Sequence, residues 1–236
     1  VTTIQTAMSD AVAATNTDIT LQFAKGGTWG SVGTDLTIAV PAGVTKLTFT
    51  YDPATTGATP VLYLNTLTYV DGLMTDGIVF DGVKLITAIA NRYLIQPSSS
   101  TVTKIPAKLT IKNCWVEGYR AILFSSIATV TSEVNFTNNY FKNIAAGGII
   151  SVSNGSVPVI NIKKNTFNNA GGDASGATGT DYFIDFRSSN SVTSQINFSN
   201  NTIYYPRTQG RGLFRLGGSG IFTTGYIKEN NNLDNG

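Results

Sequence analysis

The sequence predicts an all-β parallel solenoid, because a short unit of alternating apolar residues recurs along the chain and asparagine follows the apolar part of most units. Examples are LTIKNCWVEG, VNFTNNYFKN, INIKKNTFNN and INFSNNTIYY. We take the branched or aromatic residue before the asparagines of each unit as its anchor. The anchors are Phe80, Ile111, Phe136, Ile162, Phe198 and Ile227, and the intervals between them are 31, 25, 26, 36 and 29 residues. Units of this length cannot bury a core alone, so they are expected to stack on one another.

Each unit is expected to contain three short strands. Segments such as VINI and EVNF place an apolar residue at every second position, which is the period of a strand. After the asparagine turn comes a short strand, then a loop, then a second apolar segment such as AILFSS, GIISVS, YFIDFRSS or GLFRLGG. The longest interval contains GGDASGATGTD, residues 171–181, which is predicted to be an inserted loop. A β-propeller would need longer units with four hairpin-linked strands.

One domain is expected over residues 1–236, with a cap helix at 1–16 and coils over 17–236. The helix would cover the exposed edge of the first coil, as the end units of solenoids must. The residues that would share its apolar side are Ile4, Met8, Ala11 and Val12. The strands DITLQF, DLTIAV, KLTFTY and PVLYLN follow. The final segment, KENNNLDNG, has no comparable cap, so we expect a longer protein or loss of order there.

The residue three positions after each anchor predicts a structural ladder. These residues are Val83, Cys114, Asn139, Asn165, Asn201 and Asn230. Equivalent residues on successive coils lie about 4.8 Å apart, so inward amides can pass hydrogen bonds from coil to coil. We favour this reading over one in which the asparagines bind a metal ion or a sugar. Asn138, by contrast, is expected to stay at the turn.

Composition limits the classes of function. Charged residues make up 13% of the chain and the net charge is +2, without a charge run, which argues against a nucleic-acid partner. Histidine is absent, which excludes His-based catalytic triads and zinc sites. The single cysteine, Cys114, is expected to be a small buried residue. No apolar run is long enough to span a membrane.

The low charge content and 24 glycines are typical of extracellular β proteins. We therefore expect a secreted, periplasmic or cell-surface protein whose signal or lipoprotein segment is not part of this chain.

Several segments resemble a known superfamily. TIQTAMSDA with DITLQFAKGGTW, then VPAGVTKLTF, GIVFDGVKL and the later asparagine units, are similar to right-handed single-stranded parallel β-helices of the pectate-lyase-like superfamily. The closest resemblance is to uncharacterised pectate-lyase-like domains of bacterial surface lipoproteins, and it covers nearly the whole chain. It implies a fold more than a function, because members include lyases, hydrolases, esterases, adhesins and binding modules.

The catalytic motifs of that superfamily are mostly missing. A Gly-His-Gly motif is impossible without histidine, and no Asp-Asp pair is present. YYPRTQGRG contains the two arginines and the proline of the pectate-lyase arginine motif, but at the wrong spacing. TDYFIDFRSS resembles a pectin-methylesterase segment, but the companion Gln-Asp motif of that family is absent. The resemblance therefore implies binding rather than chemistry, and no catalytic residue is assigned.

In similar β-helices the polysaccharide groove lies on the sheet after the long loop, here the ILFSS series. The residues expected to point inward are Ile122, Ile150, Ile184 and Phe214. The outward row beside them would then be Leu123, Ser151, Asp185 and Arg215, and the next row Ser125, Ser153 and Arg187. A second column would contain Arg92, Arg120, Asp181 and Arg211, and the loop IYYPRTQGR would add Tyr204, Tyr205 and Arg207.

Arginine forks bind carboxylates with two parallel hydrogen bonds, and tyrosine faces stack on sugar rings. The alternative is that Asp185 and Arg215 form an ordinary cross-strand surface pair, worth under roughly 1 kcal/mol, and that the tyrosines only cover a coil edge.

These features predict a secreted or surface-attached module that binds an acidic, uronate-containing polysaccharide without cleaving it. One alternative is a polysaccharide lyase in which an arginine abstracts the proton α to a uronate carboxyl group while calcium neutralises that group. Another is a structural spacer that presents other domains. No cofactor is expected, and calcium only for a lyase. The Asp-Gly pairs at Asp71, Asp76 and Asp81 are more typical of tight turns than of a calcium site.

Overall fold

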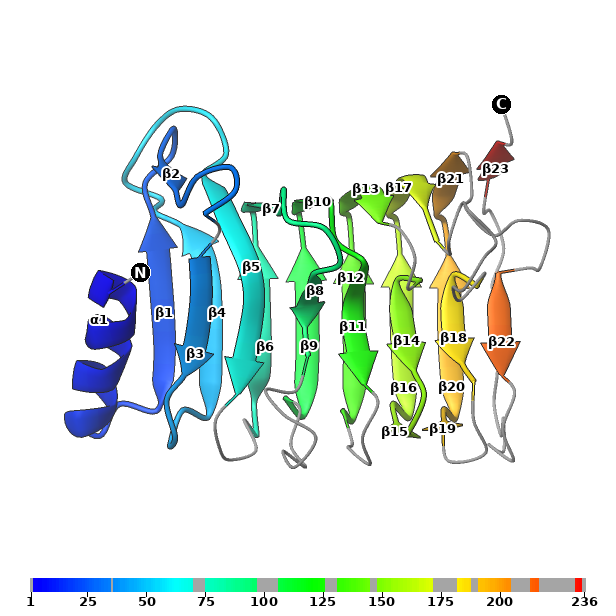
Figure 1. Ribbon diagram of the computed structural model, residues 1–236, viewed down its shortest axis with the longest axis horizontal. Helices are drawn as coiled ribbons and strands as arrows, with labels where there is room; N and C mark the ends of the chain where they lie inside the picture. Colours follow the sequence, from blue (N-terminus) through cyan, green and yellow to red (C-terminus); the bar gives the residue numbers. More distant parts are fainter. Residues whose placement is uncertain are drawn as a thin grey trace.

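The chain forms a parallel β-solenoid with one short N-terminal helix (Figure 1). The structure, a computed structural model, describes residues 2–34, 36–69, 75–96, 106–125, 131–144, 148–171, 182–187, 191–204, 213–216 and 232–234. The helix is α1 (Thr2–Ala13), and it lies at one end of the stack of coils. Strands of successive coils pair in parallel along the length of the stack.

Three sheets line the solenoid. Sheet A is ordered β1 (Asp18–Phe23), β4 (Lys46–Tyr51), β6 (Gly77–Asp81), β9 (Lys108–Lys112), β12 (Glu133–Thr137), β16 (Val159–Lys163) and β20 (Gln195–Ser199). Sheet B contains β2 (Thr28–Trp29), β5 (Val61–Tyr69), β7 (Lys84–Ile86), β10 (Trp115–Glu117), β13 (Tyr140–Ile144), β17 (Thr166–Ala170), β21 (Thr202–Tyr204) and β23 (Asn232–Asp234). Sheet C contains β3 (Leu36–Val40), the second half of β5, β8 (Tyr93–Ile95), β11 (Ala121–Ser125), β14 (Ile150–Val152), β18 (Ile184–Phe186) and β22 (Phe214–Leu216).

The long strand β5 joins sheets B and C, because its first residues pair with β7 and Leu67 pairs with β8. A separate two-stranded sheet pairs β15 (Gly155–Ser156) with β19 (Ser191–Val192). In Figure 1 the strands of sheet C lie in front of those of sheet A, and the short strands of sheet B run along one long edge.

The predicted anchors form one column in the core. Strand pairing aligns Phe80 with Ile111, then Phe136, Ile162 and Phe198. All five side chains are buried. The predicted period is therefore confirmed over these coils, while Ile227 lies outside the described residues.

The N-terminal helix covers the first coils as expected, although it ends at Ala13 rather than at residue 16. Met8 is fully buried, and Ile4, Ala11 and Val12 pack against the core. The amide of Gln5 also donates to the Ala39 carbonyl (2.7 Å) and accepts from the Ala39 N–H (3.2 Å). The helix thus satisfies the N–H and C=O groups of one residue of β3 by hydrogen bonds, and it also covers apolar surface. Among the described residues, no helix is long and apolar enough to cross a membrane.

The asparagine turn contains one residue in the left-handed backbone region. Its φ is 67° at Gly82, 56° at Asn113, 57° at Asn138, 58° at Lys164 and 56° at Asn200. Glycine and asparagine tolerate this conformation better than other residues. Asn138 therefore stays at the turn, as predicted.

The residue after it faces inward and forms the predicted ladder. The Asn139 side-chain oxygen accepts from the Cys114 N–H (2.9 Å), that of Asn165 from the Asn139 N–H (3.0 Å), and that of Asn201 from the Asn165 N–H (3.0 Å). Each of these amides also donates to a carbonyl of the preceding coil, at Ile111, Phe136 and Ile162 respectively. The ladder residues are buried. Asn230 lies outside the described residues.

Cys114 occupies the ladder position of its coil without an amide. Its thiol donates to the Lys112 carbonyl at 3.1 Å. Burial raises the pKa of Cys114 from 9.0 to about 12, with a backbone hydrogen bond to Val83 offsetting part of the effect. The thiol is therefore a buried neutral group, as the sequence predicted.

A second ladder runs along the outer face of sheet A. The Asn161 amide donates to Asn135 (2.8 Å), and the Asn197 amide donates to Asn161 (2.6 Å). These side chains are half-buried. Water can reach the groups that would lose a partner. Removing one of these asparagines should therefore cost less free energy of unfolding than removing one from the inner ladder.

We predict that Asn165→Ala lowers the free energy of unfolding by about 2–4 kcal/mol, because it leaves the buried Asn139 N–H and the Phe136 carbonyl without a partner. The matched control is Asn161→Ala in the outer ladder, with an expected loss of at most about 1 kcal/mol. Urea unfolding followed by circular dichroism measures both. Equal losses in the two variants would contradict the structural role of the inner ladder.

The Cys114 thiol makes stability depend on pH. The folded-state pKa lies above the unfolded one, so its contribution is complete below pH 9.0 and declines as pH rises toward about 12. Between about pH 8 and about pH 10.5 the wild type should lose about 2 kcal/mol more than Cys114→Ala. Urea unfolding of both proteins at the two pH values measures this difference, and parallel losses would exclude a buried neutral thiol.

Candidate functional site

The outer face of sheet C brings together part of the predicted site. Strand pairing aligns Ser151 with Asp185, and Asp185 with Arg215. The expected row through these three residues is therefore correct. Two other expectations for this sheet are wrong: Leu123 pairs with Ile150 and is buried, and Ser125 pairs with Val152 rather than Ser153.

Phe124 occupies the position beside Ser151 that Leu123 was expected to fill. The error has a physical reason. Ile122, Leu123 and Phe124 are three consecutive apolar residues, so the alternation does not specify which of them faces the core.

Asp185 is a buried carboxylate held by two arginines. Its side chain is 0% exposed. Arg215 donates from Nε to Oδ1 (2.6 Å) and from Nη2 to Oδ2 (2.9 Å), which is a bidentate pair. Arg187 Nη2 lies 3.3 Å from Oδ2 and donates to Ser151 Oγ at 2.9 Å. Asp185 and Arg215 thus form the cross-strand pair considered as the alternative, but the carboxylate of that pair is buried rather than at the surface.

Both arginine side chains remain partly exposed, at 38% for Arg187 and 32% for Arg215. The guanidinium of Arg215 also lies 4.8 Å from the ring centroid of Tyr182. Two arginines and one carboxylate leave this cluster with one excess positive charge. Asp185 is the sole acidic residue in the strands of sheet C, so no other strand residue of that sheet offsets the charge.

A second pair of arginines lies on neighbouring coils, immediately before the strands β8 and β11 of sheet C. The Arg120 N–H donates to the Arg92 carbonyl at 2.6 Å, so these residues are adjacent, as the predicted column required. The guanidinium of Arg120 lies 5.6 Å from the Tyr93 ring, which stacks on Phe124 with centroids 4.2 Å apart. Among the described residues, the buried Arg120 Nε has no hydrogen-bond partner.

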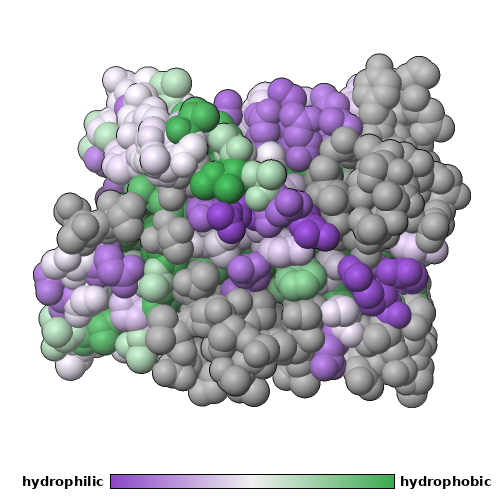
Figure 2. Space-filling model, viewed as in Figure 1, coloured by the Kyte–Doolittle hydropathy of each residue, from purple (hydrophilic) through white to green (hydrophobic). Residues whose placement is uncertain are grey.

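Together these groups form what we call the arginine strip, defined by Arg92, Arg120, Arg187, Arg215, Asp185, Tyr93, Phe124 and Tyr182. Figure 2 shows this face of the molecule, with hydrophilic side chains over β18 and an apolar patch over β11. The strip combines cations with aromatic rings along the solenoid axis. Such a surface can bind an anion and stack a ring beside it.

Other predicted site residues are not in the strip. Tyr204 is the last residue of β21, pairs with Asn168 in sheet B, and is 38% exposed. Asp181, Tyr205, Arg207 and Arg211 lie outside the described residues. Of the Asp-Gly aspartates, Asp81 pairs with Lys112 at 3.0 Å, Asp76 is exposed, and Asp71 lies outside the described residues.

The sequence reading missed the rings of Tyr93, Phe124 and Tyr182. It also missed Trp115 and Tyr140, which pair with each other in sheet B. A signal for this last pair was present, since both residues stand four positions after an anchor. Tyr93 and Phe124 carried no such signal, because they are not at equivalent positions of their strands and meet only through side-chain stacking.

Comparison with known proteins adds no relative: no protein-family model, no curated protein and no solved structure matches this chain. What this face can bind follows from its own side chains.

We predict that Arg215→Met lowers the free energy of unfolding by about 3 kcal/mol, because it removes the bidentate partner of a buried carboxylate. Arg187→Met is the matched control. It should cost less, since Arg187 makes a single, longer contact with Asp185. The double variant Asp185→Asn, Arg215→Met should recover most of the loss. Thermal and urea unfolding of the wild type, Asp185→Asn, Arg215→Met and the double variant form a double-mutant cycle, and strictly additive effects would show that the pair is not coupled.

Proposed function

We propose that this chain is a solenoid module that binds an acidic polysaccharide along the arginine strip without cleaving it. The observation that carries the proposal is the charge at sheet C, where Arg187 and Arg215 pair with a carboxylate that is itself buried, and Arg92 and Arg120 immediately precede the strands β8 and β11. A uronate polymer offers carboxylates at regular intervals, and guanidinium forks suit such groups.

The arrangement of Asp185 supports binding through preorganised cations. It holds Arg215 by two hydrogen bonds and Arg187 by an ion pair, so these flexible side chains lose less freedom when a ligand arrives. The stacked rings of Tyr93 and Phe124 are positioned beside this cluster, because Phe124 pairs with Ser151. They supply an apolar face for a sugar ring next to the cations.

Binding without cleavage is supported by the state of the one carboxylate in these strands. Both oxygens of Asp185 already accept hydrogen bonds or ion pairs from arginine, so it is not arranged as a general base toward a substrate. The chain contains no histidine to take that role. The resemblance to pectate-lyase-like domains of surface lipoproteins fits a secreted or surface-attached binding module.

The test is binding to polygalacturonate, with fully methyl-esterified pectin as the uncharged comparison, measured by isothermal titration calorimetry. Arg92→Gln with Arg120→Gln should weaken binding about tenfold, equivalent to about 1.4 kcal/mol. Among the described residues, the partners of the Asp185 carboxylate are Arg187 and Arg215, so removing Arg92 and Arg120 should leave that buried cluster and the fold intact. The matched control is Lys108→Gln with Lys163→Gln, which removes two exposed charges from sheet A.

Equal binding by the arginine variant and the wild type would overturn the assignment of the strip. Equal binding of methyl-esterified pectin would overturn the acidic ligand. A product with ultraviolet absorbance typical of an unsaturated uronate, formed during long incubation with calcium, would overturn the proposal that the chain does not cleave its ligand.

A further inference from the structure

We propose a second and separate saccharide site at the corner where sheet A turns into sheet B, which takes a sugar residue bearing a carboxylate or sulfate. This site shares no residue with the arginine strip. It goes beyond the proposed function, because neither site needs the other in order to bind.

The site is a surface hollow of about 420 Å³. Its volume lies in the range of pockets that hold small ligands. Its lining spans five successive coils, from Thr59 to Thr166, and includes Lys84, Asn113, Trp115, Asn138 and Tyr140. Cys114 and Asn139, which also line it, belong to the buried ladder, so the hollow lies directly outside the part of the structure that holds the coils in register.

Two aromatic rings form an apolar surface within this hollow. Trp115 and Tyr140 are paired on neighbouring strands, with ring centroids 4.4 Å apart. The row continues with Thr166, whose small side chain offers little cover to the Tyr140 ring. Sugar rings stack their C–H faces on the electron-rich faces of such aromatics.

Hydrogen bonds restrain both rings. The indole N–H of Trp115 donates to Glu117 Oε2 at 2.8 Å, and the Tyr140 hydroxyl accepts from the Asn168 amide at 2.8 Å. A rigid platform costs little conformational entropy on binding. The bonded atoms lie at the ring edges, so they do not cover the face of Tyr140 toward Thr166, which is the face proposed for the sugar, whereas Trp115 already contacts Lys84 and Tyr140.

Two lysines make the hollow selective for an anion. Lys84 lies over the Trp115 ring, with Nζ 4.5 Å from the centroid, and Lys164 occupies the turn position two coils beyond Trp115. Within the described part of the chain, neither lysine pairs with a carboxylate. Lys112 and Lys142 differ, since they are neutralised by Asp81 (3.0 Å) and Glu117 (3.2 Å). The uncompensated charge in the hollow is therefore positive.

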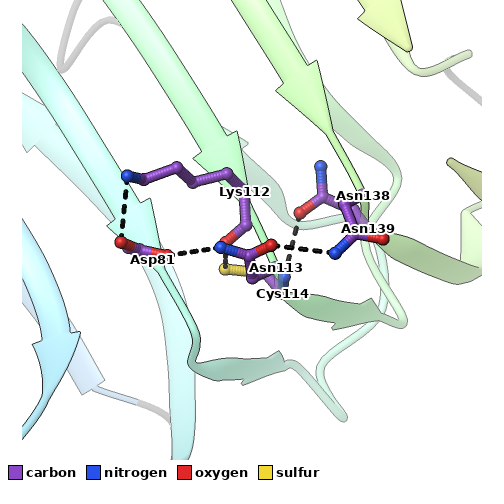
Figure 3. Close-up of polar contacts among 6 residues, drawn as sticks. All are labelled: Asp81, Lys112, Asn113, Cys114, Asn138 and Asn139. Carbon is purple, nitrogen blue, oxygen red and sulfur yellow. Dashed lines mark hydrogen bonds and ion pairs between the residues drawn. The ribbon is translucent and has the colours of Figure 1, made fainter. Parts of the chain in front are cut away.

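The turn asparagines provide a group for sugar hydroxyls. Asn113 donates to Asp81 (2.9 Å) and Asn138 donates to Asn113 (2.9 Å), as Figure 3 shows. This outer chain of amides ends at Asn138, because the next turn position is Lys164. Asn138 lines the hollow, and the following turn residue, Lys164, is not an asparagine that could donate to its side-chain oxygen.

Tryptophan fluorescence tests this site directly. The chain has two tryptophans, so the variant Trp29→Phe leaves Trp115 as the sole reporter. The probes are an oligogalacturonate, its methyl ester, a sulfated galacto-oligosaccharide of similar length, and adenosine monophosphate. We expect a saturable change in Trp115 emission with at least one of the two acidic saccharides, at least about tenfold tighter than with the methyl ester. The two acidic probes distinguish a carboxylate ligand from a sulfate ligand.

In the same background, Lys84→Gln with Lys164→Gln should weaken this binding about tenfold, whereas Lys108→Gln with Lys163→Gln should leave it unchanged. Arg92→Gln with Arg120→Gln should also leave the Trp115 signal unchanged, which separates this site from the arginine strip. Absence of a Trp115 response to every saccharide would overturn this inference and leave the strip untouched. An equal response to the methyl ester would overturn the anionic ligand, and an equal response to adenosine monophosphate would overturn the saccharide assignment.

Discussion

The buried asparagine ladder is the interaction on which the rest of this structure depends. Asn139, Asn165 and Asn201 each accept from a peptide N–H of the coil before and donate to a carbonyl there. A coil shifted by one residue would place an amide against an apolar neighbour and leave several buried groups unsatisfied. The ladder therefore reinforces the register between coils that the buried apolar side chains already favour.

Because the register is specified, each outward position becomes a column that runs along the solenoid. On sheet A the column contains the asparagines of the outer ladder. On sheet B it contains Trp115 and Tyr140, and on sheet C it contains Asp185 and Arg215. Binding surfaces in such a fold arise from neighbouring coils, so changing one residue in one coil alters a local patch without altering the scaffold.

Asp185 shows how a buried charge can organise such a patch. A carboxylate removed from water would be costly if it stood alone. Here Arg187 and Arg215 compensate it, and their positions are thereby restrained. Lys84, in the hollow at the corner of sheets A and B, is placed differently, since it lies over the Trp115 ring rather than beside a carboxylate. The first arrangement favours directed recognition of a planar anion, and the second places a point charge beside a stacking surface.

The sequence by itself determined the solenoid, the column of anchors, the cap helix and the inner ladder. It could do so because these features repeat at a fixed spacing, and each repeat is a separate instance of the same physical requirement. It also brought Asp185, Arg187 and Arg215 to one face. Only the tertiary structure decided that Asp185 is buried, that Phe124 rather than Leu123 faces outward, and that Tyr93 stacks on it. The burial of Asp185 and the stacking of Tyr93 depend on side chains from different coils that cover one another. The outward position of Phe124 depends on a choice among consecutive apolar residues. Neither follows a repeating pattern in the sequence, so the sequence alone could not predict them.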